Sequence, residues 1–153
     1  HRYAHQAEGS VSRALALAEP GLERVRRELI DELASRHGLS APALARRMET
    51  YAKEAGKESV DQRGRARVLV GELARFFRSV LWQTAGEEPP AADPADRQAI
   101  LDLARTLEPE EVFLLADRCL QADWHVQRMV YLPLVFEGLA ADLERILRGR
   151  PRE

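Results

Sequence analysis

The sequence has little of what builds disulfides, metal sites or membrane spans. It contains one cysteine, Cys119, which excludes an internal disulfide framework, and its four histidines are scattered without metal-ligand spacing. No apolar run approaches the roughly 18 residues of a membrane span, and the first residues lack the apolar core of a signal peptide. We therefore expect a cytoplasmic protein without a structural metal and without membrane contact.

An excess of charge of one sign is also missing. The 23 basic and 25 acidic side chains leave a net charge of −2, which argues against a dedicated nucleic-acid binder. The composition, 45% hydrophobic and 31% charged, is close to that of soluble globular domains. The 153 residues fit one domain, or one domain plus a fragment. Because the sequence begins at His1 rather than Met, we expect a piece of a longer protein.

Apolar residues recur every three or four positions between widely spaced prolines and glycines, which predicts helices throughout. We expect an all-α fold, a bundle of about six to eight helices. The expected helices cover 22–36, 40–57, 59–85, 96–107, 109–120 and 126–147. The second half of the 59–85 segment is apolar on nearly every side, which predicts burial from several directions. Pro133 predicts a kink near Met129 or a break into two helices.

The segment 86–95 contains three prolines and three acidic residues but no large apolar side chain, which is typical of a surface linker. We expect Asp96 to cap the helix that follows it. Residues 21–85 hold 13 basic and nine acidic side chains, whereas residues 86–153 hold eight basic and 14 acidic ones. This asymmetry favours either attraction between the two parts or ordinary solvated faces.

Catalytic motifs are not evident. The segment 55–58 (AGKE) resembles the end of a phosphate loop, but Tyr51 stands at the upstream glycine position and no Ser or Thr follows the lysine. Glu110 and Glu111 begin a helix, where acidic side chains interact with the helix dipole. Cys119 lies among leucines, which favours core packing over nucleophilic chemistry. We assign no catalytic residue and no metal ligand.

Arginine supplies 21 of the 23 basic side chains. The planar guanidinium suits interface ion pairs and phosphate contacts. A basic strip for duplex phosphates would consist of Arg24, Arg26, Arg27, Arg46, Arg47, Arg63, Arg65 and Arg67. Acidic residues are interleaved with these arginines, so direct DNA contact is the less favoured interpretation.

The segment 8–17 (EGSVSRALAL) has the pattern of a helix start. Gly9 ends one helix, Ser10 caps the next, and Arg13 lies in its first turn. A cation at that position opposes the helix dipole, so Arg13 either points at an anion such as a phosphate or is solvated.

This segment, AEGSVSRALAL, resembles the Gly-Ser-x-x-Arg-Ala-Leu segment in the lid of AAA+ clamp-loader proteins, the delta-prime and gamma/tau family of bacterial DNA polymerase III. The closing segment LVFEGLAADLERIL is similar to the leucine-rich final helix of that family. One departure is the absence of asparagine, because the family often has an Asn-containing turn before its last helix.

The resemblance implies that residues 1–20 are the end of an AAA+ lid and that 21–153 form a helical collar, an oligomerisation domain. Arg13 would be a sensor-2-like residue that faces a nucleotide. The Walker motifs are absent, so this fragment would hold no cofactor and hydrolyse no ATP. The resemblance places ATP in the full-length protein or its neighbours.

The function implied is that of a clamp-loader subunit, most like delta-prime, in DNA replication. Its collar would pack against the gamma/tau and delta subunits, hold the ring that loads the sliding clamp, and meet DNA only through the complex. The candidate interface residues are Phe76, Phe77, Trp82 and Trp124, each of which can instead be ordinary core. The alternative is the ligand-sensing bundle of a transcriptional regulator, with these aromatics around a pocket. A stand-alone helical enzyme lacks a defensible residue set.

Overall fold

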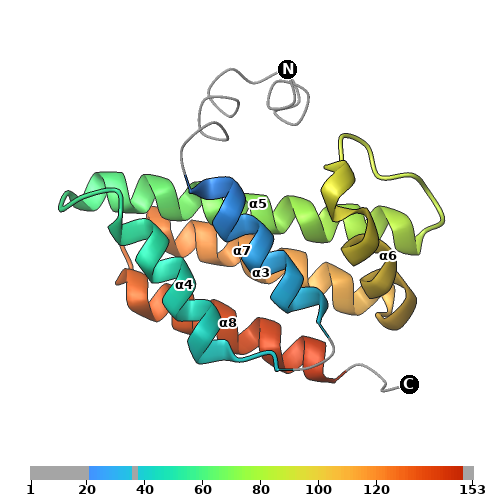
Figure 1. Ribbon diagram of the computed structural model, residues 1–153. Helices are drawn as coiled ribbons and strands as arrows, with labels where there is room; N and C mark the ends of the chain where they lie inside the picture. Colours follow the sequence, from blue (N-terminus) through green and yellow to red (C-terminus); the bar gives the residue numbers. More distant parts are fainter. Residues whose placement is uncertain (1–20, 36–37, 150–153) are drawn as a thin grey trace.

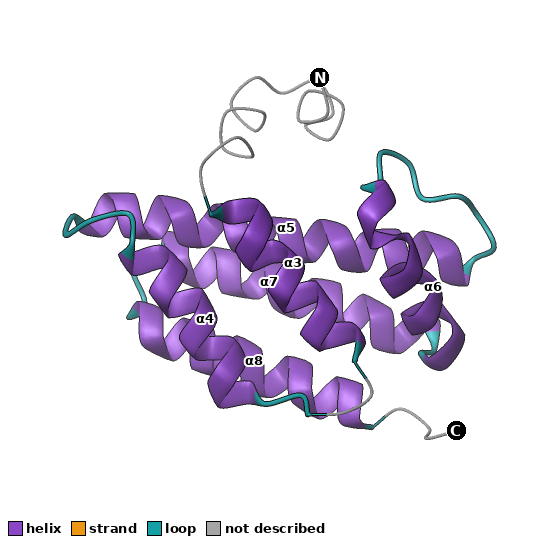
Figure 2. Ribbon diagram, viewed as in Figure 1, coloured by secondary structure: helices purple, strands orange, loops and turns teal. Residues whose placement is uncertain are grey.

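The computed structural model describes residues 21–35 and 38–149, and these residues are helical apart from short connections (Figure 2). Within this part the all-α prediction is confirmed. The α-helices are α3 (Leu22–Ala34), α4 (Ala41–Lys53), α5 (Ser59–Thr84), α6 (Arg97–Thr106), α7 (Pro109–Gln127) and α8 (Leu132–Arg148), and a short 3₁₀ helix, η1 (Pro94–Asp96), precedes α6.

The described helices form two layers. Helices α5, α7 and α8 lie side by side, with α7 packed along both of the others (Figure 1). Helices α3, α4 and α6 lie in front of this layer in the same view. Each member of the front layer packs against the back layer: α3 and α6 contact α5, and α4 contacts both α5 and α8. The core is therefore enclosed between the two layers, on one side of α5 and α7.

Helix starts follow their sequence signals. The Ser40 hydroxyl accepts a hydrogen bond from the Ala43 amide at 3.4 Å, and Pro42 occupies the first turn of α4, as predicted. Helix α7 begins with a capping box, in which the Glu111 carboxylate accepts the Glu108 amide at 2.9 Å. These contacts satisfy amides that have no partner within their own helix.

The predicted break near Pro133 is confirmed. Helix α7 ends at Gln127, and Met129 adopts the left-handed conformation with φ 64°. Pro133 then sits in the first turn of α8, where its missing amide costs nothing. The expected junction between the helices 109–120 and 126–147, which would include Trp124 and His125, is wrong, because α7 contains no glycine or proline after Pro109 and its inward stripe continues through Val126.

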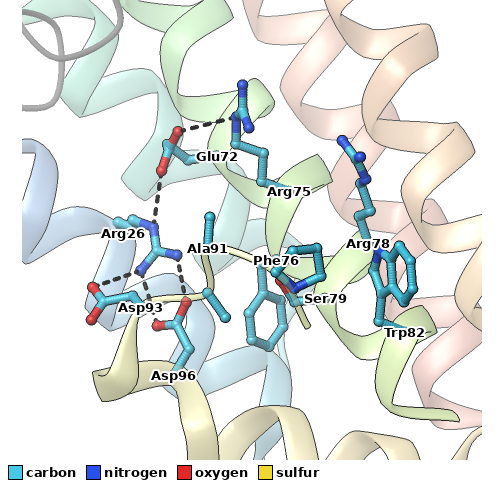
Figure 3. Close-up of a pocket in the computed structure, with 12 residues that line it drawn as sticks. Arg26, Glu72, Arg75, Phe76, Arg78, Ser79, Trp82, Ala91, Asp93 and Asp96 are labelled. Carbon is cyan, nitrogen blue, oxygen red and sulfur yellow. Dashed lines mark hydrogen bonds and ion pairs between the residues drawn. The ribbon is translucent and has the colours of Figure 1, made fainter. Parts of the chain in front are cut away.

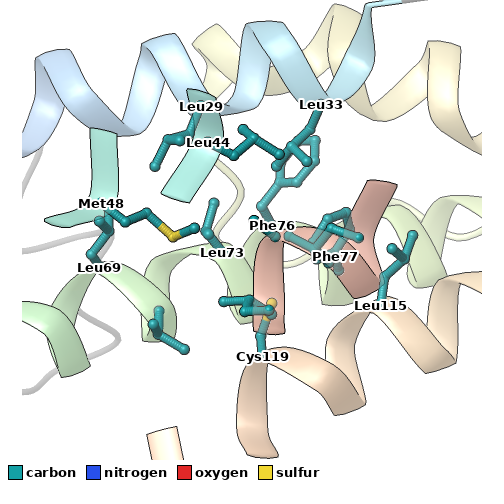
Figure 4. Close-up of a cluster of buried hydrophobic side chains, with 14 of the residues drawn as sticks. Leu29, Leu33, Leu44, Met48, Leu69, Leu73, Phe76, Phe77, Leu115 and Cys119 are labelled. Atoms are coloured by element: carbon teal, nitrogen blue, oxygen red, sulfur yellow. The ribbon is translucent and has the colours of Figure 1, made fainter. Parts of the chain in front are cut away.

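The core is one contiguous cluster of apolar side chains (Figure 4). It receives the inward stripes of all six helices, including Leu29, Met48 and Leu73. Phe76, Phe77 and Val80 are buried as well, so the second half of α5 is enclosed on several sides as its composition predicted. Cys119 is also completely buried, as predicted.

The segment 86–95 connects α5 to η1 and α6. Its first residues, Gly86 to Glu88, are exposed, whereas Asp93 and the following Asp96 are buried. Asp96 is the N-cap residue of α6, as predicted, but its side chain makes no capping hydrogen bond to that helix. The Asp96 carboxylate instead forms a buried ion pair with Arg26 of α3.

Every described helix is too short or too polar to traverse a lipid bilayer.

Candidate functional site

The structure separates the four aromatic residues proposed for an interface. Phe76 and Phe77 point into the core and pack edge to face with 5.4 Å between ring centroids. Their proposed interface role is corrected to a core role, because α5 turns both rings away from solvent. Trp82 and Trp124 lie at the surface, with 39% and 53% of their area exposed. Arg13 and the rest of the predicted lid lie outside the described residues.

Helix α7 is apolar on two sides. Its inward side buries a stripe that includes Val112 and Cys119 against α5. Its outward side carries Phe113, Leu120 and Trp124, exposed by 60%, 61% and 53%. Spacings of seven and four residues place these three side chains in one stripe along the helix. A second apolar stripe of this kind has no role in the core of the described chain.

Helix α5 presents a second face beside this stripe. Val60, 76% exposed, and Trp82 lie at its two ends, with Gly64, Arg67 and Gly71 between them at helical spacing. We call Val60, Gly64, Gly71 and Trp82 of α5, together with Phe113, Leu120 and Trp124 of α7, the outer face.

An ion pair joins the two parts of the outer face. The Arg67 Nε atom lies 2.8 Å from the Asp123 Oδ1 atom, and the neighbouring Arg63 guanidinium donates to the Val126 carbonyl at 3.1 Å. Because rising numbers in α5 match falling numbers in α7, these contacts set the two helices antiparallel. At the end of α7 the Arg128 guanidinium covers the Trp124 ring at 4.7 Å.

The two glycines of the outer face are not required by the described fold. A Cβ atom added at Gly64 or Gly71 would meet nothing within 4 Å. Both positions lie inside α5, where glycine costs about 1 kcal/mol relative to alanine. Their use leaves these two positions without a side chain, on either side of the exposed Arg67, where the helix backbone is open to close approach.

A buried charge cluster lies beside α5, where α3 and the segment before α6 pack against this helix (Figure 3). Arg26 donates two hydrogen bonds to the Asp96 carboxylate, at 3.0 and 2.6 Å, and its Nε atom lies 3.3 Å from the Glu72 Oε1 atom. Asp93 lies 4.0 Å from Arg26, and Arg27 donates to Asp96 at 2.7 Å. The cluster ties α3 to α5 and to the segment that precedes α6.

Burial alone would lower the pKa of the Arg26 guanidinium, but the nearby carboxylates outweigh burial and raise this pKa above its ordinary value. The Asp96 carboxylate contributes most of the increase, followed by those of Glu72 and Asp93. Arg26 is therefore permanently charged. The adjoining cavity, lined also by Phe76 and Trp82, has a volume of about 40 Å³. That volume suits a few water molecules rather than a substrate. The geometry of the cluster indicates a structural role, in which it holds α3, α5 and the segment before α6 together.

Six of the eight arginines of the predicted basic strip contact groups of the chain itself, whereas Arg24 and Arg46 are exposed. Besides the arginines of the buried cluster, Arg47 pairs with Glu28 at 2.9 Å and with Glu32 at 3.3 Å. The Arg65 guanidinium stands 4.8 Å from the centre of the Tyr51 ring. Together with Arg63 and Arg67, these pairings divide most of the proposed strip among separate partners.

Two of the larger hollows involve α8. A groove between α7 and α8 has a volume of about 260 Å³ and an apolar lining that includes Leu134 and Leu139. The Arg118–Asp142 ion pair, at 3.6 Å, lies along it. A third hollow of about 200 Å³ lies where α4, α5 and α8 meet, with Lys53 and Arg63 in its lining. Neither hollow contains the tryptophans that the ligand-sensing alternative places around a pocket.

The Cys119 thiol is enclosed in the core. Burial raises the pKa of the Cys119 thiol, which keeps it protonated and unreactive. Residues 21–35 and 38–149 contain no group of three or more His, Cys, Asp or Glu side chains arranged to hold a metal ion.

Comparisons with protein-family models, curated proteins and solved structures gave no match.

Proposed function

We propose that the chain is an oligomerisation domain that packs against other protein subunits through the outer face. The observation that carries this proposal is the second apolar stripe of α7, formed by Phe113, Leu120 and Trp124. Large apolar side chains gathered on one rigid surface are typical of sites that another protein covers. Neighbouring Val60 and Trp82 of α5 extend that surface.

The size of the outer face supports this proposal. With about 200 Å² for each large side chain, the exposed fractions correspond to roughly 350 Å² on α7 and about 230 Å² on α5. A standard interface covers about 800 Å² on each partner, and roughly 65% of it is apolar between subunits. The outer face therefore offers the apolar area of one standard interface, provided that both helices take part.

We further propose that the assembly is the collar of a DNA polymerase III clamp loader, with this chain in a delta-prime-like position. The support is the resemblance of the AEGSVSRALAL segment and of the closing helix, together with the all-α bundle. In this role the domain holds gamma/tau and delta subunits in the ring that places the sliding clamp on DNA. It contributes association rather than ATP hydrolysis.

Co-elution tests both the outer face as a docking site and the clamp-loader collar as the assembly. The purified chain is mixed at micromolar concentration with gamma/tau and delta collar domains and analysed by size-exclusion chromatography. Two variants accompany it: Leu120→Glu on the outer face and Leu134→Glu in the α7–α8 groove, whose side chains are 61% and 60% exposed. We expect complexes with the wild type and with Leu134→Glu but not with Leu120→Glu. A complex that survives Leu120→Glu would refute the outer face as the docking site.

A further inference from the structure

We infer that the hollow where α4, α5 and α8 meet is a binding site for a small aromatic carboxylate. The end of α4 and the starts of α5 and α8 lie at the same end of the bundle (Figure 1), and the hollow between them has a volume of about 200 Å³. Sites for small molecules combine an apolar lining with a few polar groups that orient the ligand. The hollow shares no residue with the outer face, so this site is independent of the proposed docking role.

The inner part of the hollow is apolar. Ala52 of α4 and Phe136 of α8 line it and are buried. Leu132 and Pro133, at the start of α8, are half-buried and continue the apolar lining toward solvent. An apolar cavity of about 150 Å³ accommodates benzene. A hollow of about 200 Å³ therefore has room for one aromatic ring with a short substituent.

Tyr131 adds an aromatic ring at the outer part of the hollow. Its side chain is 66% exposed, whereas Phe136 is completely buried. A ligand ring that enters the hollow contacts Phe136 at its inner end and Tyr131 at its outer end. Contacts between aromatic rings contribute beyond the area that they bury, which favours an aromatic over an aliphatic ligand.

Arg63 supplies a positive charge that has no counter-ion within residues 21–35 and 38–149. Its Nε atom donates to the Ser59 hydroxyl at 3.3 Å, and its guanidinium also donates to the Val126 carbonyl at 3.1 Å. Both acceptors are neutral, so these bonds position the half-buried guanidinium without balancing its charge. A guanidinium forms strong, charge-assisted hydrogen bonds with a carboxylate, which would balance it.

The other charges of the lining do not remove this excess. Lys53 and Glu49 also line the hollow, four residues apart on one side of α4, and their charges cancel each other. With Arg63, the lining has two cations and one carboxylate, a net charge of +1. A monocarboxylate balances this charge, whereas a phosphate monoester, with about −1.5 to −2, exceeds it. The apolar interior and the net charge together therefore match an aromatic monocarboxylate.

A nuclear magnetic resonance titration of the full chain with phenylacetate tests this site. Phenylacetate carries one ring and one carboxylate, phenylacetamide has the same shape without the charge, and acetate lacks the ring. We expect saturable shifts of the backbone amides of Lys53, Arg63 and Tyr131 with phenylacetate at millimolar concentration. Phenylacetamide and acetate should bind at least tenfold more weakly, because each lacks one of the two groups that the hollow contacts.

Matched variants test the role of each charge. Arg63→Gln should weaken phenylacetate binding at least tenfold, and Lys53→Gln, at an exposed position, roughly two- to fivefold. Lys57→Gln is the matched control, because Lys57 is exposed and lies outside the hollow. Glu49→Gln removes the opposing charge and should strengthen binding. Glu54→Gln, exposed and outside the hollow, should leave binding unchanged.

The contrary results are equally specific. Shifts that do not saturate, shifts confined to residues outside the hollow, or equal binding of phenylacetate and phenylacetamide would overturn the site. Equal effects of Lys53→Gln and Lys57→Gln would overturn it as well. Circular dichroism checks that each variant keeps the helix content of the wild type, and Lys53→Gln tests the site even if Arg63→Gln does not fold. Leu120→Glu should bind phenylacetate as the wild type does, so loss of this site leaves the docking role of the outer face unaffected.

Discussion

Replacing Arg26 with methionine should destabilise the fold more than any comparable change at the surface. Methionine keeps much of the length and volume of the side chain but removes the guanidinium. Asp96 would lose two hydrogen bonds, of 3.0 and 2.6 Å, and Glu72 would lose a cation at 3.3 Å. All three side chains are buried. Carboxylates left in a buried site without their cation bear a large desolvation penalty.

The magnitude follows from what remains around the carboxylates. Removing one partner of a buried ion pair costs about 3–5 kcal/mol. Arg27 still donates to Asp96 at 2.7 Å, and Arg75 stays 4.0 Å from Glu72. These two cations reduce the loss, so we expect Arg26→Met to lower the free energy of unfolding by about 3 kcal/mol.

Urea denaturation followed by circular dichroism measures this loss. The measurement is made in the Leu120→Glu background, so that association does not contribute. Arg47→Met is the matched control, because the Arg47 side chain is 43% exposed and also pairs with two carboxylates. Exposed pairs contribute about 0–1 kcal/mol. Equal losses in the free energy of unfolding for Arg26→Met and Arg47→Met, or a loss below about 1 kcal/mol for Arg26→Met, would refute the stabilising role of the buried charge cluster.

Three further predictions concern the core and the outer face. Because burial raises the pKa of Cys119, only the unfolded state loses its proton above about pH 8.5. Stability should therefore fall by up to about 1.4 kcal/mol per pH unit above that value relative to Cys119→Ala, in urea titrations from pH 7 to 10. Gly64→Ala should raise the stability of the monomer by about 0.5–1 kcal/mol, measured by thermal unfolding; a decrease would show that the fold needs glycine there. Gly71→Leu should weaken the binding of collar domains at least tenfold in size-exclusion titrations while leaving the helix content unchanged; unchanged binding would remove Gly71 from the contact.

The helices were predictable because their signals are local. Ser40 with Pro42, and Pro109 with the acidic residues beside it, act within one turn, so their effects can be read without the rest of the chain. The break before Pro133 is local in the same sense. The predicted helix 109–120 is shorter than α7, because the apolar pattern predicts a junction before residue 126 although no glycine or proline interrupts the helix there.

The surface and the charge cluster needed the tertiary structure. Phe76, Phe77 and Trp82 all belong to the apolar end of α5, and only the packing of neighbouring helices decides which of them is covered. Arg26 and Asp96 lie 70 residues apart, so their pairing has no signal in the local sequence. The second apolar stripe of α7 is visible in the sequence as Phe113, Leu120 and Trp124, but periodicity alone does not tell an outward stripe from a core one.

Size-exclusion chromatography of the wild type, Leu120→Glu and Leu134→Glu with gamma/tau and delta collar domains tests the docking role of the outer face most directly. The wild type and Leu134→Glu should co-elute with the collar domains, whereas Leu120→Glu should elute alone at the position of the 17.3 kDa chain. A wild type that elutes alone, or a complex that Leu134→Glu disrupts and Leu120→Glu does not, would contradict the docking of another subunit on α5 and α7.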